Sequence, residues 1–196
     1  MKKIIQKENP LLREISLKVP EKDITSVKIA KILNEMKVAL DSQEDGVAIA
    51  APQIGYNVRI FIIAARFLPK RKNIQATEVV TELEKEHLIF INPVITKLSR
   101  DKREMEEGCL SVRYLYGKVL RSQKATVVAY DENGNKFTKG VSGLVSQIFQ
   151  HEIDHLDGIL FIDTARSIEE VIPEQVSSNR TVQTHELTNA TNKKIH

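Results

Sequence analysis

The sequence predicts an α+β fold in which mainly antiparallel sheets pack around a central helix near the C-terminal end. Two segments repeat apolar residues at helical spacing, and short apolar runs and a hairpin signal lie between them. Strands and helices do not alternate regularly, which argues against a parallel sheet. The 196 residues are the size of one ordinary globular domain.

The first helix is expected near residues 23–41. Its apolar residues fall on one helical face: Ile29, Ile32, Leu33, Met36 and Leu40. A segment of small residues follows at 46–55, and its two glycines suit a backbone that another molecule approaches closely. The helical period returns over 141–156, where we expect the second helix.

Strands are expected in the apolar runs between the helices. Buried strands are predicted at 59–63 and at 88–91, the second ending before Asn92 and Pro93. A hairpin is predicted where the strand-like run 125–130 meets the turn 131–135 and continues into 136–138.

Two regions are expected to contribute little to the core. Residues 67–87 are polar and charged, which predicts a surface insertion with a short helix at 77–85. Residues 167–196 are rich in Ser, Thr, Asn, Gln and Glu, so we expect a loosely packed or disordered tail. The sequence therefore divides into a folded domain over 1–166 and a polar tail over 167–196.

Composition excludes several classes of protein. The chain has 29 Lys and Arg against 26 Asp and Glu, and this net charge of +3 is spread along it. Proteins that track phosphates concentrate their cations, so DNA is not an expected partner. The single Cys cannot form an internal disulfide. No apolar stretch is long enough for a signal peptide or a membrane span, so we expect a cytoplasmic protein without membrane contact.

The segment 150–155 reads Gln-His-Glu-Ile-Asp-His. On a helix, His151 and His155 project from one face about one turn apart, so both imidazoles can bind one metal ion. Glu152 lies beside the first ligand, where its carboxylate can reach a water on the metal without entering the coordination sphere. The spacing predicts a hydrolase that activates water with a metal, and a solvated helix face is the alternative.

A catalytic metal takes three protein ligands and keeps one position open. Cys109 is the first candidate for the third ligand, because charged residues and a glycine surround it rather than apolar residues. A buried Cys without a function is the alternative. Three carboxylates compete for the same position: Asp154, Asp157 and Asp163.

Three segments resemble, in order, the signature motifs of peptide deformylases. They read Gly-Val-Ala-Ile-Ala-Ala-Pro-Gln at 46–53, Glu-Gly-Cys-Leu-Ser at 107–111 and Gln-His-Glu-Ile-Asp-His-Leu-Asp-Gly at 150–158. The resemblance extends over residues 3–165. It therefore identifies 1–166 as a deformylase-like catalytic domain.

The resemblance implies an enzyme that removes the N-formyl group from the initiator N-formylmethionine of nascent polypeptides and releases formate. It implies one divalent ion, usually Fe(II), on Cys109, His151 and His155, while Zn, Ni or Co also suit these donors. Glu152 matches the general base and acid. Gln53 and the backbone N–H of Leu110 match the donors to the developing oxyanion.

The methionine side chain is expected beside the metal. Leu144 and Ile148 share one face of the predicted second helix with His151, so they can floor an apolar pocket. By resemblance, the pocket also draws on the first motif, here Val47 and Ala48, and on Gln147, at a position more often apolar in relatives. The alternative is that Gln147 faces solvent, because its position lies off the centre of the apolar face.

Two residues depart from the usual family pattern. Ala48 stands where the family usually has Gly, and its N–H is still available to a peptide. Arg113 stands where bacterial members often have Pro, so the substrate-side rim is expected to differ.

The expected partners are nascent formylmethionyl peptides and, through them, the ribosome exit region. Lys70, Arg71 and Lys72 are candidates for contact with rRNA phosphates, although a short charged run is usually a solvated loop.

Two other functions are compatible with parts of the pattern. A zinc peptidase would use the same two His and take a downstream ligand such as Glu169 or Glu170, leaving Cys109 unused. A deformylase-like binding module would use its metal only to hold the fold.

Overall fold

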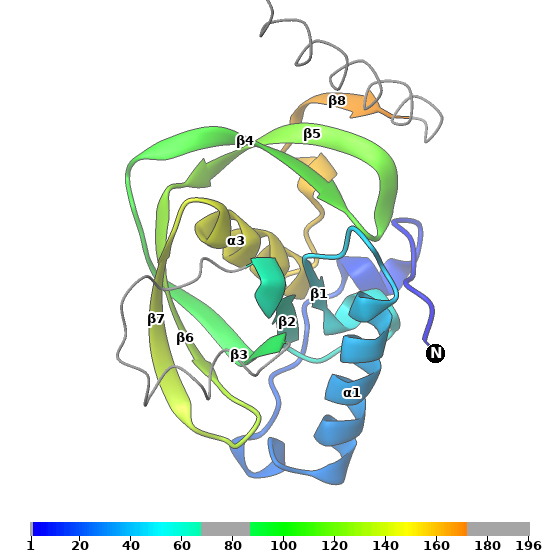
Figure 1. The fold of residues 1–196 in the computed structure, drawn as a ribbon, viewed down its shortest axis with the longest axis vertical. Coiled ribbons are helices and arrows are strands. Elements are labelled where there is room, and N and C mark those ends of the chain that lie inside the picture. Colours follow the sequence, from blue (N-terminus) through cyan, green and yellow to red (C-terminus); the bar gives the residue numbers. More distant parts are fainter. Residues whose placement is uncertain (1, 68–86, 172–196) are drawn as a thin grey trace, which may run out of the picture.

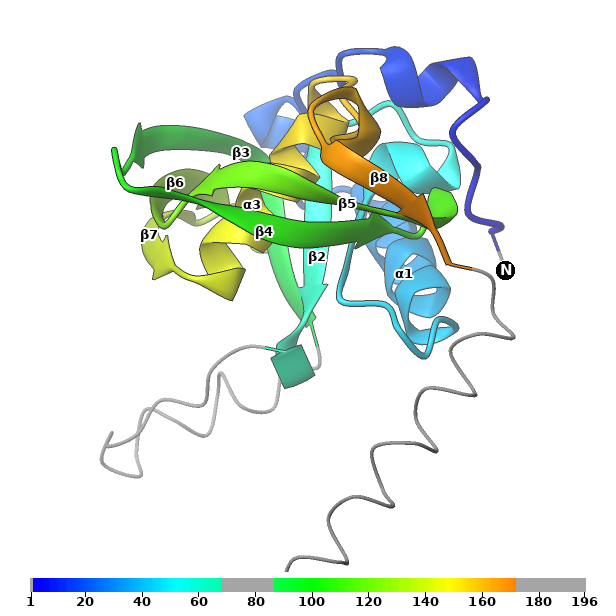
Figure 2. The ribbon, with the colours of Figure 1, turned by 90° about the horizontal axis from the view of Figure 1, so that it is seen from above.

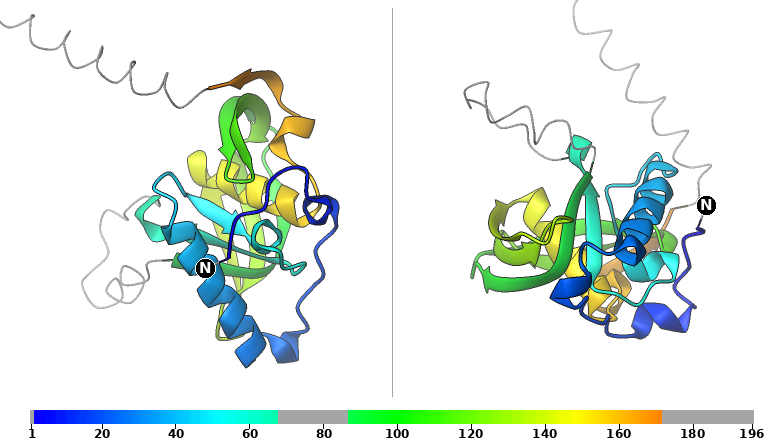
Figure 3. Two further views of the ribbon diagram at one scale, coloured as in Figure 1. Left: turned by 90° about the vertical axis from the view of Figure 1, so that its right-hand side faces the viewer. Right: turned by 90° about the horizontal axis from the view of Figure 1, so that it is seen from below.

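A computed structural model describes residues 2–67 and 87–171. Within these ranges the chain forms two antiparallel sheets and two α-helices, α1 (Val27–Asp41) and α3 (Leu144–Leu156). Every pairing between named strands is antiparallel. The predicted α+β class is confirmed, and α3 lies centrally between the two sheets (Figures 1 and 3).

The larger sheet has five strands in the order β1-β2-β3-β6-β7. Their bounds are β1 (Ala48–Ala50), β2 (Ile60–Ala64), β3 (His87–Leu98), β6 (Lys124–Tyr130) and β7 (Lys136–Ser142). The smaller sheet has the order β4-β5-β8, with β4 (Lys102–Cys109), β5 (Val112–Ser122) and β8 (Arg166–Glu170). The three strands lie side by side across the front of the view in Figure 2.

The two helices cover opposite faces of the five-stranded sheet. On β2, Ile60 and Ile62 pack into the cluster that contains α1, whereas Phe61 and Ile63 pack into the cluster that contains α3. Successive side chains of a strand point to opposite faces, so a strand buried on both faces reads as a continuous apolar run. This arrangement explains the unbroken sequence Ile60-Phe61-Ile62-Ile63.

A third apolar cluster fixes the smaller sheet to the rest of the domain. It joins two strand residues of β5 to the short helices η1 (Pro10–Arg13) and η5 (Phe161–Asp163). Its buried members are Leu12, Val112, Val119, Leu160 and Phe161. The hairpin of β4 and β5 is thereby held over α3 (Figure 1).

Both predicted helices exist but begin later than expected. The side chain of Ser26 accepts a hydrogen bond from the Ile29 N–H and caps α1, so the helix starts at residue 27 rather than 23. Residues 141 and 142 belong to β7, and Gly143, with φ of 58°, separates them from α3. The segment 141–156, which the helical period predicted to be one helix, therefore contains the end of β7 and the whole of α3.

The predicted strands are present with shifted ends. β3 does not stop before Asn92; it continues to residue 98 through a register shift between Ile91 and Val94. Asn92 adopts φ of 52° and its side chain bonds to both backbone groups of Val19, so an irregularity replaces the expected strand end. The hairpin turn is confirmed, with two backbone N–H groups donating to the Asp131 carboxylate.

The two polar regions fall largely outside the described residues. At the edges of the predicted insertion, Phe67 packs against the core and His87 is buried at the start of β3, so these end residues belong to the folded domain. Residues 68–86, with Lys70, Arg71, Lys72 and the expected helix, lie outside the described part. Residues 167–170, assigned to the tail, form β8 instead because they pair with β5.

No helix in the described ranges is long and apolar enough to cross a membrane.

Candidate metal centre

Helix α3 places two imidazoles and a carboxylate at one buried end of a pocket. His151 and His155 lie one helical turn apart, with ring centroids 4.9 Å from each other. The side chains of His155 and Glu152 are both buried. The helix ends at Leu156 with Asp157 as its C-cap, and Gly158 adopts φ of 75°, where a Cβ would come within 2.6 Å of the Arg13 carbonyl oxygen.

Cys109 reaches the same point from the end of β4. Its Sγ lies 3.1 Å from His155 Nε2, and the Ser111 N–H points to it from 3.4 Å. One donor atom from each of Cys109, His151 and His155 lies within 4.8 Å of the others, and the described residues contain no other such group. The structure therefore brings together the three predicted ligands.

The competing ligands are engaged elsewhere. Asp154 contacts Arg121 at 2.6 Å, and Asp157 contacts Arg59 at 2.6 Å. Asp163 pairs with Arg13 and accepts the Leu160 N–H. The downstream carboxylates Glu169 and Glu170 are exposed on β8 and pair there with β5. None of these carboxylates joins the three-donor group.

The protonation states suit a cation. Burial alone would raise the pKa of the Cys109 thiol, but the neighbouring His155 and His151 outweigh it and lower that pKa to about 5. Burial raises the pKa of the Glu152 carboxyl to about 7, against the opposing effect of the two imidazoles. Cys109 is thus a thiolate at neutral pH, while Glu152 can change its protonation state there.

Two buried polar atoms at this point lack a hydrogen-bond partner among the described residues: Glu152 Oε2 and His155 Nδ1. Unpaired buried polar atoms are rare in folded proteins and commonly mark a site for water or an ion. A soft thiolate and two imidazoles are the donors that Fe, Zn, Ni and Co accept, and three of them leave a position open. The residues fit a catalytic divalent ion.

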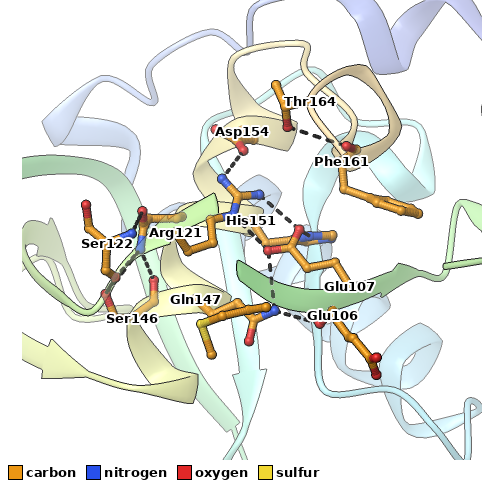
Figure 4. Close-up of polar contacts among 12 residues, drawn as sticks. Glu106, Glu107, Arg121, Ser122, Ser146, Gln147, His151, Asp154, Phe161 and Thr164 are labelled. Carbon is orange, nitrogen blue, oxygen red and sulfur yellow. Dashed lines mark hydrogen bonds and ion pairs between the residues drawn. The ribbon is translucent and has the colours of Figure 1, made fainter. Parts of the chain in front are cut away.

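A buried network orients the first imidazole (Figure 4). His151 Nδ1 lies 2.9 Å from Glu107 Oε2, which leaves its Nε2 for a metal. Glu107 also accepts two hydrogen bonds from Arg121, and Arg121 contacts Asp154 from its other side. Sequence reasoning missed Arg121, because its partner lies 14 residues away across a hairpin whose register the sequence does not reveal.

Gln53 is positioned by hydrogen bonds at both ends of its amide. It lies in the short helix η3 (Ala51–Ile54), where its Oε1 accepts the Ala50 N–H at 2.8 Å. Its Nε2 donates to Ser111 Oγ at 3.1 Å and lies 3.5 Å from Cys109 Sγ. Ser111 is fully buried and was another residue that sequence reasoning missed.

Cys109 and His151 line a pocket of about 320 Å³. Its lining contains all the residues predicted to contact substrate, together with Gln53, Leu110 and Glu152. The predicted substrate residues are Val47, Ala48, Leu144, Gln147 and Ile148. The pocket lining also includes Arg113, which the sequence placed at the substrate-side rim, and Asp45, Tyr114 and Tyr116, which it did not.

Gln147 is buried rather than directed to solvent. Its Nε2 donates to the Glu106 carbonyl oxygen at 2.8 Å and lies 3.4 Å from Glu107 Oε1. The amide thus bridges α3 and β4 at the pocket wall (Figure 4).

The chain is similar to one family throughout the described residues. The profile described as Polypeptide deformylase matches residues 1–171. Peptide deformylase 2 of Clostridium acetobutylicum is 38% identical over 163 residues, covering 83% of this chain and 94% of that protein. A peptide deformylase of Desulforudis audaxviator is 37% identical over 168 residues, with coverages of 84% and 94%.

Solved structures show the same similarity. A probable peptide deformylase from Synechococcus phage S-SSM7 superposes with a TM-score of 0.68 at 32% identity, covering 84% of this chain and 99% of that one. The Met-Ala-Ser-bound peptide deformylase of Acinetobacter baumannii gives a TM-score of 0.69 at 28% identity, with coverages of 82% and 97%.

Proposed function

This chain belongs to the peptide deformylase family, and we propose that its catalysis takes place where Cys109, His151, His155 and Glu152 meet. The protein is a hydrolase that removes the N-formyl group from nascent polypeptides. In this reaction water adds to the formyl carbon, the C–N bond breaks, and formate and a free amino group leave.

One observation carries the assignment of residues. Three deprotonatable metal donors converge at the buried end of a pocket, and the unpartnered Glu152 Oε2 lies beside them. The zinc peptidase hypothesis needs a ligand from Glu169 or Glu170, and both are exposed on β8. The donor set supports Cys109 in that position.

Cys109, His151 and His155 would hold one divalent ion, for which we propose Fe(II), with Zn, Ni or Co as ions that suit the same donors. Such an ion supplies Lewis acidity and lowers the pKa of a bound water toward neutrality. The protein's part is to present a thiolate and two oriented imidazoles. Glu107 orients the first of these through His151 Nδ1.

Glu152 is the proposed proton carrier. Its carboxyl pKa of about 7 lets it accept a proton from the attacking water and donate it to the departing amine nitrogen within one turnover. Its Oε2 is available because no described residue donates to it.

Gln53 and Leu110 are the proposed donors to the formyl oxygen as negative charge develops on it. Gln53 Nε2 donates to Ser111 Oγ at 3.1 Å and makes a longer hydrogen bond to Cys109 Sγ at 3.5 Å, which the developing oxyanion can replace. The backbone N–H of Leu110 follows directly after the thiolate ligand and borders the same pocket. Loss of one such donor typically costs about 10²–10³ in rate.

The peptide has two sheet edges to bind. β1 is an edge strand of the larger sheet and β4 an edge strand of the smaller one, and both border the pocket through Ala48 and Gly108. An extended peptide can pair with such edges by main-chain hydrogen bonds. We place the methionine side chain against Val47, Leu144, Gln147 and Ile148, and the peptide Met-Ala-Ser bound to the Acinetobacter relative supports a ligand of this kind.

The substrate also suggests where the protein works. Formylated chains emerge from ribosomes, so we propose a cytoplasmic protein that acts near the ribosome exit region. We propose that the catalytic domain extends to residue 171, where the family match ends one residue after β8.

The test is formate release from formyl-Met-Ala-Ser by protein loaded anaerobically with Fe(II). Glu152→Gln should retain one metal ion per chain and lose at least about 10²-fold in kcat. Glu104→Gln, which alters an exposed carboxylate on β4, is the matched control and should match the parent. Metal-loaded Glu152→Gln that turns over at the parental rate would refute the assignment.

A further inference from the structure

One guanidinium bridges the two sides of the pocket mouth. Arg113, on β5, donates from one terminal nitrogen to Asp45 Oδ2 at 2.6 Å and from the other to Gln43 Oε1 at 2.7 Å. Asp45 and Gln43 belong to the connection between α1 and β1, which forms the opposite side of the mouth. Arg113 and Asp45 both line the pocket that contains Glu152.

The backbone that carries Arg113 departs from the regular ladder of β4 and β5. Cys109 pairs with Val112, but Gly108 pairs with Tyr116, so residues 113–115 have no partner on β4. Tyr114, at the centre of this bulge, has φ of 66°, and its carbonyl oxygen accepts the Val171 N–H at 2.8 Å. The bulge therefore directs Arg113 to the rim while β8 holds its backbone.

The ion pair itself contributes little to stability. The Asp45 side chain is 60% exposed and the Arg113 side chain 31% exposed, so water screens their attraction. Arg113 has a larger effect on the electrostatic potential at the pocket mouth. Arg113 is the only Arg or Lys among the described residues that line the pocket, whereas the lining includes four carboxylates: Asp45, Glu106, Glu107 and Glu152.

Two of these carboxylates are exposed, and Arg113 pairs with one of them. Asp45 is paired with it directly, and Glu106 is exposed on β4. Glu107 is already paired with the buried Arg121. Glu106 lies opposite Lys118 of β5, so removal of Arg113 leaves Asp45 as the carboxylate at the mouth that loses its cation.

The chain of a bound peptide must extend out of the pocket through this mouth. With the formyl group at Glu152 and the methionine side chain against α3, the following residues pass between the β1 and β4 edges toward Asp45 and Arg113. A strand rises about 3.3 Å per residue, so the first two residues after methionine come closest to these charges.

We propose that Arg113 determines which charges the peptide can carry directly after formylmethionine. By offsetting Asp45, it admits peptides with an acidic residue at the second or third position, which an unpaired Asp45 at the rim would repel. The inference rests on the proposed function, because it takes the peptide from that assignment.

The test compares formyl-Met-Glu-Ser with formyl-Met-Lys-Ser, and formyl-Met-Ala-Glu with formyl-Met-Ala-Lys. Arg113→Gln should lower kcat/KM for the acidic peptide relative to the basic one by about fivefold, the effect of one charge at roughly 8 Å in a partly screened site. Arg113→Lys should restore most of the parental ratio. Asp45→Asn should shift the ratio in the opposite direction, and added salt should reduce every shift.

Arg100→Ala provides the control, since Arg100 is an exposed cation in the turn between β3 and β4 and does not line the pocket. It should leave the acidic-to-basic ratio unchanged. A ratio that neither Arg113→Gln nor Asp45→Asn moves would overturn the proposal.

A binding measurement separates this proposal from the proposed function. The products Met-Glu-Ser and Met-Lys-Ser are titrated into the metal-loaded protein by calorimetry, and their Kd ratio should shift in the same direction in Arg113→Gln. Shifted binding without formate release by the parent would contradict the function and support the rim assignment. Formate release with unshifted Kd and kcat/KM ratios would contradict the rim assignment alone.

Discussion

Arg121 contacts both carboxylate oxygens of Glu107, with its Nε 2.7 Å from Oε1 and a terminal nitrogen 3.0 Å from Oε2. Both side chains are almost fully buried, at 8% and 2% exposure. The pair lies between the two parts of the chain that supply the donors, because Glu107 precedes Cys109 on β4 and also contacts His151 on α3. Breaking a buried pair by removing one partner leaves an uncompensated charge and typically costs about 3–5 kcal/mol.

Glu107→Gln should therefore destabilise the protein in a pH-dependent way. Burial would raise the pKa of Glu107, but the hydrogen bonds from His151 and Arg121 prevail and lower it from 4.5 to about 2. A lowered pKa stabilises the folded state fully above the unfolded value near 4.5, and this contribution is lost as the pH falls toward 2. The shift corresponds to about 3 kcal/mol.

The measurement is urea unfolding of chelator-treated parent and Glu107→Gln between pH 7 and pH 3. The difference in unfolding free energy should be largest above pH 4.5 and shrink as the solution becomes more acidic. Glu104→Gln, on the exposed part of β4, should show no such trend. A constant difference across this range would contradict the role given to the Glu107 charge.

Much of this site could be predicted from local sequence. The spacing of His151 and His155 is a property of one helix, and the motif around Cys109 is contiguous. Both patterns can therefore be recognised without knowledge of the fold. Arg121 was not predictable in the same way. Its burial depends on the register of β5 against β4, which brings it opposite the helix that carries Asp154.

The same distinction applies to the fold. β2 was evident because both of its faces are buried and its apolar run is continuous. β4 was missed because its sequence, Lys-Arg-Glu-Met-Glu-Glu-Gly-Cys, is charged and mostly exposed, and only its pairing with β5 makes it a strand. β8 is exposed at all five positions and is likewise defined by its hydrogen-bonded neighbour.

Cys109→Ser should weaken metal binding and change the spectrum of the bound ion. A serine hydroxyl is a harder ligand than a thiolate, and it is far less acidic than the Cys109 thiol, whose pKa is lowered to about 5. Metal content and the thiolate charge-transfer band of a Co(II)-loaded sample report this change. Ser111→Ala, which keeps the thiolate, should retain the band.

The thiolate also predicts sensitivity to oxidation. The Fe(II) form of the parent should lose activity in air faster than the Ni(II) form, since Fe(II) reacts with oxygen beside an oxidisable sulfur. Equal half-lives of the two forms would count against an iron–thiolate centre.

Gln147→Ile should improve methionine binding while lowering stability. An aliphatic side chain at the pocket wall adds apolar contact worth about 0.8 kcal/mol for one methylene, so KM for formyl-Met peptides should fall by a factor of a few. The same change removes the hydrogen bond to the Glu106 carbonyl, at a cost of about 1 kcal/mol in unfolding free energy. KM and the urea midpoint are measured on the same metal-loaded sample.

Gln147→Glu is the useful comparison, because it keeps the length of the side chain but loses the donor and adds a charge beside Glu107. It should raise KM. An unchanged KM in a folded, metal-loaded Gln147→Ile protein would remove this side chain from the methionine pocket.

Truncation should separate β8 from the residues that follow it. A chain ending after Val171 keeps the pairing of β8 with β5 and the hydrogen bond from Val171 to Tyr114. A chain ending after Ala165 loses both and exposes the edge of β5. The β8 side chains are exposed, so the loss is mainly of backbone hydrogen bonds, at about 2 kcal/mol in total.

For a domain of this size, that loss corresponds to a decrease in Tm of several degrees. We therefore expect the chain ending at 171 to melt like the full-length protein and the chain ending at 165 to melt lower. The shorter chain should also have a higher KM, because Tyr114 holds the backbone next to Arg113 at the pocket rim. Equal melting of the two truncated chains would show that β8 does not support the domain, and a low Tm for the chain ending at 171 would show that residues 172–196 do.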